Sequence, residues 1–255
     1  MILALDMGNT NIVVGCLGDG DEIFFTERIS TDINKTDLEY AVIIKTIMEL
    51  HDVQKSSIEG AIIASVVPPL THIVKTALRK LFNCEPLVIG AGLKTGLNIH
   101  LDDPSTMGAD LVVDSVAAMN LYGVPNIVID MGTATTVTVT NKEGTYIGGA
   151  IFPGVNVSVE ALAAGTSLLP RVSLGAPKKQ IATNTMDAIK SGIIYGEASR
   201  LDGMIERFEE ELGYPCKVVA TGGLSKVIVP HCRKDVIIDP MLMMKGLKII
   251  YDKNK

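Results

Sequence analysis

The sequence contains no tryptophan, and only 4% of its 255 residues are aromatic. Aromatic platforms on which nucleic-acid bases stack are therefore not expected. Basic residues are also in the minority, since 23 Lys and Arg stand against 29 Asp and Glu, which gives a formal net charge of −6. An acidic chain gains little from the attraction that dominates binding to nucleic acid or to an anionic membrane. We expect neither as a partner.

Cysteine is scarce and dispersed. No two of the four cysteines form a C-x-x-C pair; they are Cys16, Cys84, Cys216 and Cys232. A disulfide framework or a structural zinc site is therefore not expected, and a reducing cytoplasm suits such a chain. Asp6 interrupts the N-terminal apolar run and no basic segment precedes it, so a signal peptide is not expected. The uncharged stretch 144–159 is short for a membrane span and contains Pro153.

An internal repeat lies within a chain that is 47% hydrophobic and long enough for one or two domains. Residues 3–14 read LALDMGNTNIVV and residues 127–138 read IVIDMGTATTVT, so that Asp6 aligns with Asp130. Each copy has apolar residues before the aspartate and a β-prone run after the glycine. This pattern predicts a strand, a tight turn and a second strand in each copy. The repeat indicates a duplicated half.

The pattern after each hairpin is also shared. A third strand is expected next, and helices then alternate with strands. The expected strands are 22–27, 58–67, 87–89, 145–152, 217–221 and 236–238, and the expected helices are 35–51, 69–82, 108–122, one from 184 to about 211, one opening after Gly223 and one at 240–251. We therefore expect an α/β fold of two halves, 1–106 and 107–255, each a mixed sheet with a three-stranded meander and packed helices.

An aspartate beside a glycine turn has a specific chemical use. The turn lets backbone N–H groups approach an anion, and residues 9–11 add side-chain donors. The carboxylate of Asp6 or Asp130 repels a phosphate unless a cation lies between them, and Mg²⁺ binds one or two carboxylates together with phosphates and water. With Gly222 and Gly223 at a further strand end, the two hairpins indicate a polyphosphate site. The sequence has no Walker-type loop, no G-x-S-x-G elbow and no zinc-ligand spacing of histidines.

Several motifs occur in one order along almost the whole chain. They are Asp6-Met7-Gly8-Asn9-Thr10-Asn11, Arg28-Ile29-Ser30-Thr31, Ser65-Val66-Val67-Pro68-Pro69, Gly108-Ala109-Asp110, Asp130-Met131-Gly132-Thr133-Ala134-Thr135-Thr136, Gly148-Gly149-Ala150-Ile151-Phe152-Pro153-Gly154, Asn184-Thr185 and Thr221-Gly222-Gly223-Leu224. Each motif is modest alone, but the ordered set resembles the type III pantothenate kinases, which belong to the superfamily of acetate kinases, sugar kinases and actin. The resemblance implies duplicated halves of the actin and ribonuclease H-like kind.

The resemblance also implies an activity and a set of site residues. The activity is ATP-dependent phosphorylation of pantothenate, the first step of coenzyme A synthesis, by a homodimer whose pantothenate pocket borrows from the partner subunit. Contacts to ATP fall on Asp6, Met7, Gly8, Asn9, Thr10, Asn11, Ile12, Val13 and Thr133, and contacts to pantothenate fall on Gly108, Ala109, Asp110, Leu111 and Thr185. Asp110 is implied as the catalytic base, and Asp130 as the ligand of a monovalent cation, K⁺ or NH₄⁺. Asp6 is a candidate to hold Mg²⁺ through water.

Two positions depart from the pattern of these kinases. Leu111 stands where relatives usually have Arg, and Leu101 stands where they usually have Tyr. Leucine cannot replace the bidentate contacts of Arg with a carboxylate, and pantothenate carries one. Arg171 or Lys178 is a candidate to supply that charge. A kinase of a related small hydroxy compound and a non-catalytic regulatory homologue are the alternatives, although the retained aspartates favour catalysis.

Overall fold

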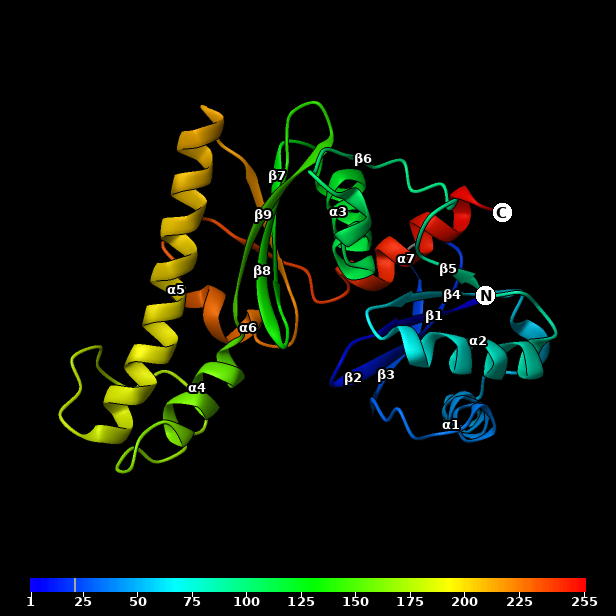
Figure 1. Ribbon diagram of the computed structural model, residues 1–255, viewed down its shortest axis with the longest axis horizontal. Helices are drawn as coiled ribbons and strands as arrows, with labels where there is room; N and C mark the ends of the chain where they lie inside the picture. Colours follow the sequence, from blue (N-terminus) through cyan, green and yellow to red (C-terminus); the bar gives the residue numbers. More distant parts are fainter. Residues whose placement is uncertain (21) are drawn as a thin grey trace. The chain divides into compact units, whose positions relative to one another are not determined.

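The computed structural model describes residues 1–20 and 22–255, and they form two compact units (Figure 1). Unit 1 contains Met1–Gly96, Asp103–Ala117 and Leu242–Lys255, and unit 2 contains Leu97–Asp102 and Ala118–Met241. Each unit is therefore built from separate stretches of the chain. The expected halves, 1–106 and 107–255, place the last fourteen residues with the C-terminal half, whereas these residues pack in unit 1. A boundary at 106/107 as the limit of the duplicated segments stays a prediction.

Unit 1 is built on a five-stranded mixed sheet. Its strand order is β3-β2-β1-β4-β5, with β1 antiparallel to β2 and parallel to β4. The strands are β1 (Ile2–Met7), β2 (Asn11–Leu17), β3 (Ile23–Ser30), β4 (Gly60–Ser65) and β5 (Leu87–Val88). The helical segments are α1 (Asp37–Leu50), η1 (Lys55–Ser57), α2 (Pro68–Phe82), η2 (Pro104–Thr106), the first part of α3 (Ala109–Tyr122), and α7 (Leu242–Lys253).

Both faces of the central strand β1 are covered. Leu3, Leu5 and Met7 lie in the same buried cluster as residues of α1 and α2. On the other face α7 packs closely, since a Cβ at Gly15 would lie 2.6 Å from the Met244 sulfur and one at Gly60 would overlap Tyr251. This double burial explains why β1 is an uninterrupted apolar run up to its aspartate.

Unit 2 repeats the same topology. Its sheet order is β11-β10-β7-β8-β9-β6, and β7 is antiparallel to β8 and parallel to β10. The strands are β6 (Asn98–Ile99), β7 (Asn126–Met131), β8 (Ala134–Thr140), β9 (Thr145–Pro153), β10 (Lys217–Thr221) and β11 (Ile237–Ile238). The helical segments are the end of α3, α4 (Val155–Ala164), α5 (Thr185–Leu212), α6 (Ser225–Ile228) and η3 (Val229–His231). The predicted fold of duplicated α/β halves is confirmed, since β9-β8-β7-β10-β11 matches β3-β2-β1-β4-β5.

Some elements differ from the sequence-based expectations. The helix α4 was not predicted, because valine is a weak helix former and a Pro-Gly pair precedes the segment. The helix expected after Gly223 is only the short α6, and β3 continues three residues beyond its expected end at Glu27. Within the described residues, no helix is long and apolar enough to cross a membrane.

Candidate functional site

The first glycine turn joins β1 to β2 in unit 1. The Gly8 N–H donates to the Asn11 carbonyl at 3.0 Å, and Asp6 lies opposite Val13 two residues before the turn. Asn9 and Thr10 are exposed at the tip, as an anion-binding turn requires. Two members of the predicted ATP-binding run do not present their side chains, because Met7 and Ile12 are buried in the core. Their contribution to a ligand is therefore limited to the backbone.

The start of α3 brings Asp110 into the same unit as this turn. The Leu111 N–H donates to Asp110 Oδ1 at 2.9 Å, and the carboxylate folds back over Gly108. A Cβ at Gly108 would overlap Asp110 Oδ1, so a glycine is required for this side-chain position. That same Cβ would lie 3.7 Å from Val66 Cγ1, and the Val66 N–H donates to the Met7 carbonyl at 3.1 Å. Gly108, two residues before the predicted base, and Met7, directly before the first turn, thus both lie beside Val66, which follows β4.

The second glycine turn joins β7 to β8 in unit 2 and is one residue shorter. The Gly132 N–H donates to the Ala134 carbonyl at 3.0 Å, and Asp130 is opposite Thr136 of β8 and Thr221 of β10. β1 and β7 share one burial pattern, in which only the aspartate is not fully buried. The repeat seen in the sequence is therefore a repeat of backbone structure and of aspartate position.

Two glycines lie against this second turn. Gly222 has φ +86°, and a Cβ there would lie 2.6 Å from Asp130 Oδ1 and 2.6 Å from both N and O of Met131. Gly154 donates its N–H to the Thr133 carbonyl at 3.2 Å, and a Cβ there would overlap that carbonyl. Thr133, predicted to contact ATP, is exposed. The absence of side chains at these glycines leaves the Asp130 carboxylate and the turn in a space bounded by backbone atoms.

The carboxylates of Asp6 and Asp130 suit cations that prefer oxygen ligands and take most of those ligands from phosphates, water or backbone. Within residues 1–20 and 22–255, no group of three or more His, Cys, Asp or Glu residues is arranged to hold a metal. Mg²⁺ commonly binds one or two carboxylates and takes its other ligands from phosphates and water, so Asp6 beside its turn suits it. The Asp130 carboxylate and the Met131 carbonyl both lie close to Gly222. Carboxylate and carbonyl oxygens are hard ligands, which such cations prefer.

The acceptor-side predictions fall on both units. In unit 2, Thr185 is the exposed first residue of α5, whose N-cap Asn184 accepts from the Asp187 N–H at 2.9 Å. Leu101 is half-buried, 3.7 Å from the Cβ position of Gly148. Arg171 is exposed and paired with Glu160 at 2.6 Å.

In unit 1, Ala109, Asp110 and Leu111 form the half-buried first turn of α3. A carboxylate in the first turn of a helix lies at the favourable end of the helix dipole.

Cysteine is not a nucleophile at this site. All four cysteines are free, and burial raises the pKa of each thiol. For Cys216 the pKa rises to about 11 and for Cys232 to about 12, in both cases because desolvation disfavours the thiolate, with nearby carboxylates adding to the effect. The thiols are therefore protonated near neutral pH.

The paired hairpins, each followed by a third strand and by parallel strands with helices, define the class: a duplicated actin-like fold with a glycine turn at the same place in each half. Solved structures of low identity share this fold. A Campylobacter jejuni protein provisionally assigned to the Baf family of transcriptional activators has a TM-score of 0.61 at 19% identity, covering 99% of this chain and 98% of its own. Component A of the (R)-2-hydroxyglutaryl-CoA dehydratase of Acidaminococcus fermentans has a TM-score of 0.58 at 16% identity, covering 98% and 96%.

Sequence comparison is more specific than the fold. The profile of the type III pantothenate kinase family matches residues 2–207. A type III pantothenate kinase from Geobacillus sp. strain WCH70 is 44% identical over 254 residues, which covers 100% of this chain and 98% of the relative. The chain belongs to the type III pantothenate kinase family. Membership identifies it as a kinase, an enzyme that transfers a phosphoryl group from ATP.

Proposed function

We propose that this chain phosphorylates pantothenate with ATP to give 4′-phosphopantothenate, the first step of coenzyme A synthesis, in the cytoplasm. The observation that carries the proposal is that Asp110 and the first glycine turn belong to one unit, in which Gly108 and Met7 both lie beside Val66. Phosphoryl transfer requires a phosphate-binding loop and a carboxylate that orients the attacking hydroxyl. Full-length relatives named as pantothenate kinases support the choice of acceptor.

The proposed reaction assigns roles to the first glycine turn and to Asp110. The exposed Asn9 N–H of the first turn binds a phosphate of ATP, since the Gly8 N–H is already bonded to the Asn11 carbonyl. Asp110 accepts the proton of the pantothenate hydroxyl while the oxygen of that hydroxyl forms a bond to the γ-phosphorus. The bond between the γ-phosphorus and the β–γ bridging oxygen breaks, and ADP leaves. General-base assistance of this kind typically contributes ~10²–10⁴-fold to the rate.

The two turn aspartates are proposed to bind cations. Asp6 would hold hydrated Mg²⁺, and Asp130 would hold K⁺ or NH₄⁺ beside the backbone of Met131. Bound cations neutralise the negative charge of the phosphates. Without them, the carboxylates of Asp6 and Asp130 would repel the phosphates. The roles of Asp6 and Asp130 are separate in the proposal, because each carboxylate belongs to a different unit.

A homodimer is part of the proposal. Unit 2 exposes five large apolar side chains between residues 151 and 186: Ile151, Val157, Leu168, Ile181 and Met186. Leu168 is 90% exposed and Ile181 is 87% exposed, so both side chains are accessible to a partner. A second copy of the chain covering this region would bury them. Sedimentation equilibrium tests this, since a mass of one chain at micromolar concentration would contradict the proposed dimer.

The proposal is tested by identifying the product. Purified chain is incubated with ATP, Mg²⁺, K⁺ and pantothenate, and the mixture is analysed by mass spectrometry and by coupled ADP release. We expect one equivalent of 4′-phosphopantothenate for each ADP. ADP release that pantothenate does not stimulate, with no phosphorylated pantothenate, would overturn the proposed acceptor.

A further inference from the structure

The first glycine turn is held from outside by one residue. Thr31 directly follows β3, and its hydroxyl donates to the Gly8 carbonyl at 2.6 Å. Its backbone N–H donates to the Thr10 carbonyl at 3.0 Å. In a planar trans peptide, C=O and N–H point in opposite directions. Fixing the Gly8 carbonyl toward Thr31 therefore directs the Asn9 N–H away from it, in an exposed turn where an anion can approach.

The residue after Thr31 is fixed by a buried tyrosine. The Tyr40 side chain from α1 is 1% exposed and belongs to the core of unit 1. Its hydroxyl accepts from the Asp32 N–H at 3.2 Å and donates to the Asp32 carbonyl at 2.9 Å. These two bonds hold both peptide groups of Asp32, and so restrict the rotation of Thr31 next to it.

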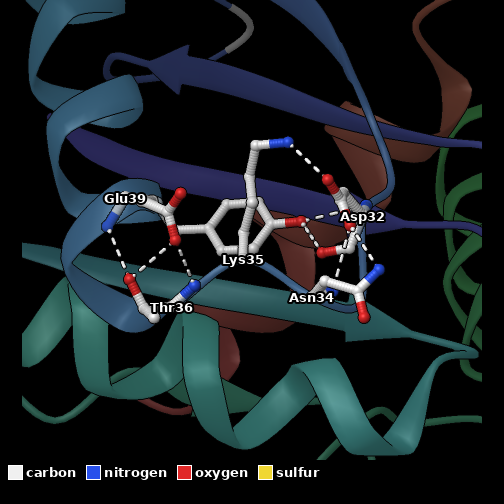
Figure 2. Close-up of polar contacts among 6 residues, drawn as sticks. Asp32, Asn34, Lys35, Thr36 and Glu39 are labelled. Atoms are coloured by element: carbon white, nitrogen blue, oxygen red, sulfur yellow. Dashed lines mark hydrogen bonds and ion pairs between the residues drawn. The ribbon is translucent and has the colours of Figure 1, made fainter.

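The rest of the segment closes onto the start of α1 (Figure 2). The Asp32 carboxylate accepts from the Asn34 N–H at 3.0 Å and pairs with the Lys35 ammonium at 2.8 Å. Lys35 holds the pKa of the Asp32 carboxyl below its usual range. Thr36 and Glu39 complete a capping box, in which the Thr36 N–H donates to Glu39 Oε2 at 2.7 Å. Between the turn and α1, each residue labelled in Figure 2 takes part in one of these hydrogen bonds or ion pairs: Asp32, Asn34, Lys35 and Thr36.

We infer that Tyr40 and Thr31 are positioning residues that set the phosphate turn for ATP. Neither is required to touch ATP: Tyr40 fixes Asp32, Asp32 fixes Thr31, and Thr31 fixes Gly8 and Thr10. A phenylalanine would fill the same core position without a buried hydroxyl that needs partners, so the hydroxyl is explained by what it binds. The inference rests on the proposed function, in that it takes the turn as the ATP-phosphate site.

Kinetic measurements distinguish a hydroxyl that positions the turn from one that only stabilises the fold. A hydroxyl that only stabilises the fold would change the unfolding temperature and leave the KM values alone. A hydroxyl that sets the turn changes the affinity for ATP and leaves the KM for pantothenate unchanged. Loss of one such hydrogen bond typically corresponds to ~2- to 13-fold in affinity.

The experiment compares four single variants with the wild type. Tyr40→Phe and Thr31→Val each remove one hydroxyl at nearly constant shape, Thr31→Ser keeps the hydroxyl, and Tyr122→Phe removes a hydroxyl that instead donates to Asp239 at 2.8 Å in unit 2. We measure the dissociation constant of a fluorescent ATP analogue, both KM values and the thermal midpoint. Tyr40→Phe and Thr31→Val should weaken nucleotide binding about 2- to 13-fold, while Thr31→Ser and Tyr122→Phe bind like the wild type.

Two results would overturn the inference. One is wild-type nucleotide affinity in Tyr40→Phe that unfolds as a cooperative transition. The other is equal binding by Thr31→Val and Thr31→Ser, which decides the matter if Tyr40→Phe does not fold. Nucleotide binding is measured without pantothenate, so a wild type that binds the analogue but fails to phosphorylate pantothenate would contradict the proposed acceptor and leave this inference standing.

Discussion

Gly222 lies against the second turn in a left-handed conformation. Its φ of +86° disfavours any side chain, and a Cβ there would lie 2.6 Å from Asp130 Oδ1 and from the Met131 backbone. The strand pairing of Thr221 with Asp130 brings the two segments together. The half-buried Asp130 carboxylate is thus placed near backbone atoms, which is the arrangement proposed for the monovalent cation.

We predict that Gly222→Ala lowers stability and abolishes activation by K⁺. Left-handed backbone strain costs roughly 1–2 kcal/mol, and overpacking against backbone adds typically ~1–3 kcal/mol. Thermal unfolding and initial rates in K⁺ and Na⁺ are the measurements. The matched control is Gly92→Ala, which has φ +90° but no atom within 4 Å of its Cβ. If both variants keep the K⁺ response, activation by K⁺ does not require the close approach of Gly222 to Asp130.

The leucines at 101 and 111 are expected to weaken pantothenate binding. Leu111 is the half-buried residue directly after Asp110, where an arginine could pair with the substrate carboxylate. Loss of a charge-assisted contact costs ~1.5–3 kcal/mol, about 10–150-fold in affinity. We predict that Leu111→Arg lowers the KM for pantothenate and leaves the KM for ATP unchanged, and that adding Leu101→Tyr lowers it further.

The control for that change is Leu50→Arg, which adds the same charge at a 75% exposed position. A lower pantothenate KM in the control would show a non-specific charge effect. An arginine buried without a partner would reduce the thermal midpoint instead, because an uncompensated charge is costly. An unchanged KM in a stable Leu111→Arg protein would contradict the prediction and indicate that another residue holds the carboxylate.

At the scale of elements, the parts that the sequence predicted are those with local signals. The two hairpins follow from an apolar run before each aspartate and a β-prone run after the glycine turn, α2 from the Pro-Pro at its start, and α5 from the Asn184 cap. The helix α4 has no side-chain cap and is rich in valine, so its formation depends on packing rather than on local preference. The role of Tyr40 could not be predicted from the sequence for a similar reason, since its hydrogen bond to Asp32 forms only when β3 and α1 pack together.

The end of α2 provides an element-scale test of pH dependence. Arg79 donates to Glu85 at 2.5 and 2.6 Å and Lys75 pairs with it at 2.6 Å, which lowers the Glu85 pKa from 4.5 to about 2. The unfolded chain therefore takes up this proton at a higher pH than the folded chain. The stabilisation is fully present above pH 4.5 and is lost as the pH falls toward 2.

We predict that Glu85→Gln has a lower thermal midpoint than the wild type at neutral pH and low salt. The difference should shrink as the pH falls below 4.5 and vanish only once the pH is below 2. Glu143→Gln, at a looser exposed pair of 3.9 Å with Lys142, is the control. A difference that stays constant across this pH range would show that the Glu85 charge is not its origin.

At the scale of the whole molecule, the duplication was visible in the sequence but the composition of the units was not. A repeated motif reveals that two halves exist, and the matching sheet orders follow from it. That residues 242–255 join unit 1 depends on packing between distant segments, as at Gly246, where a Cβ would lie 2.5 Å from the Val113 carbonyl. For the candidate site, the sequence named the turn residues, whose roles stay predictions, whereas the hydrogen bonds of Thr31 and Tyr40 behind the first turn depend on packing.

The central claim is that Asp110 acts as the base in transfer from ATP to pantothenate. The most direct measurement is the turnover number and the nucleotide affinity of Asp110→Asn, with Asp52→Asn as a control at an exposed residue whose φ of +56° asparagine tolerates. The account predicts that Asp110→Asn binds the ATP analogue like the wild type and loses turnover ~10²–10⁴-fold. Near-wild-type turnover of pantothenate by a folded Asp110→Asn protein would contradict it.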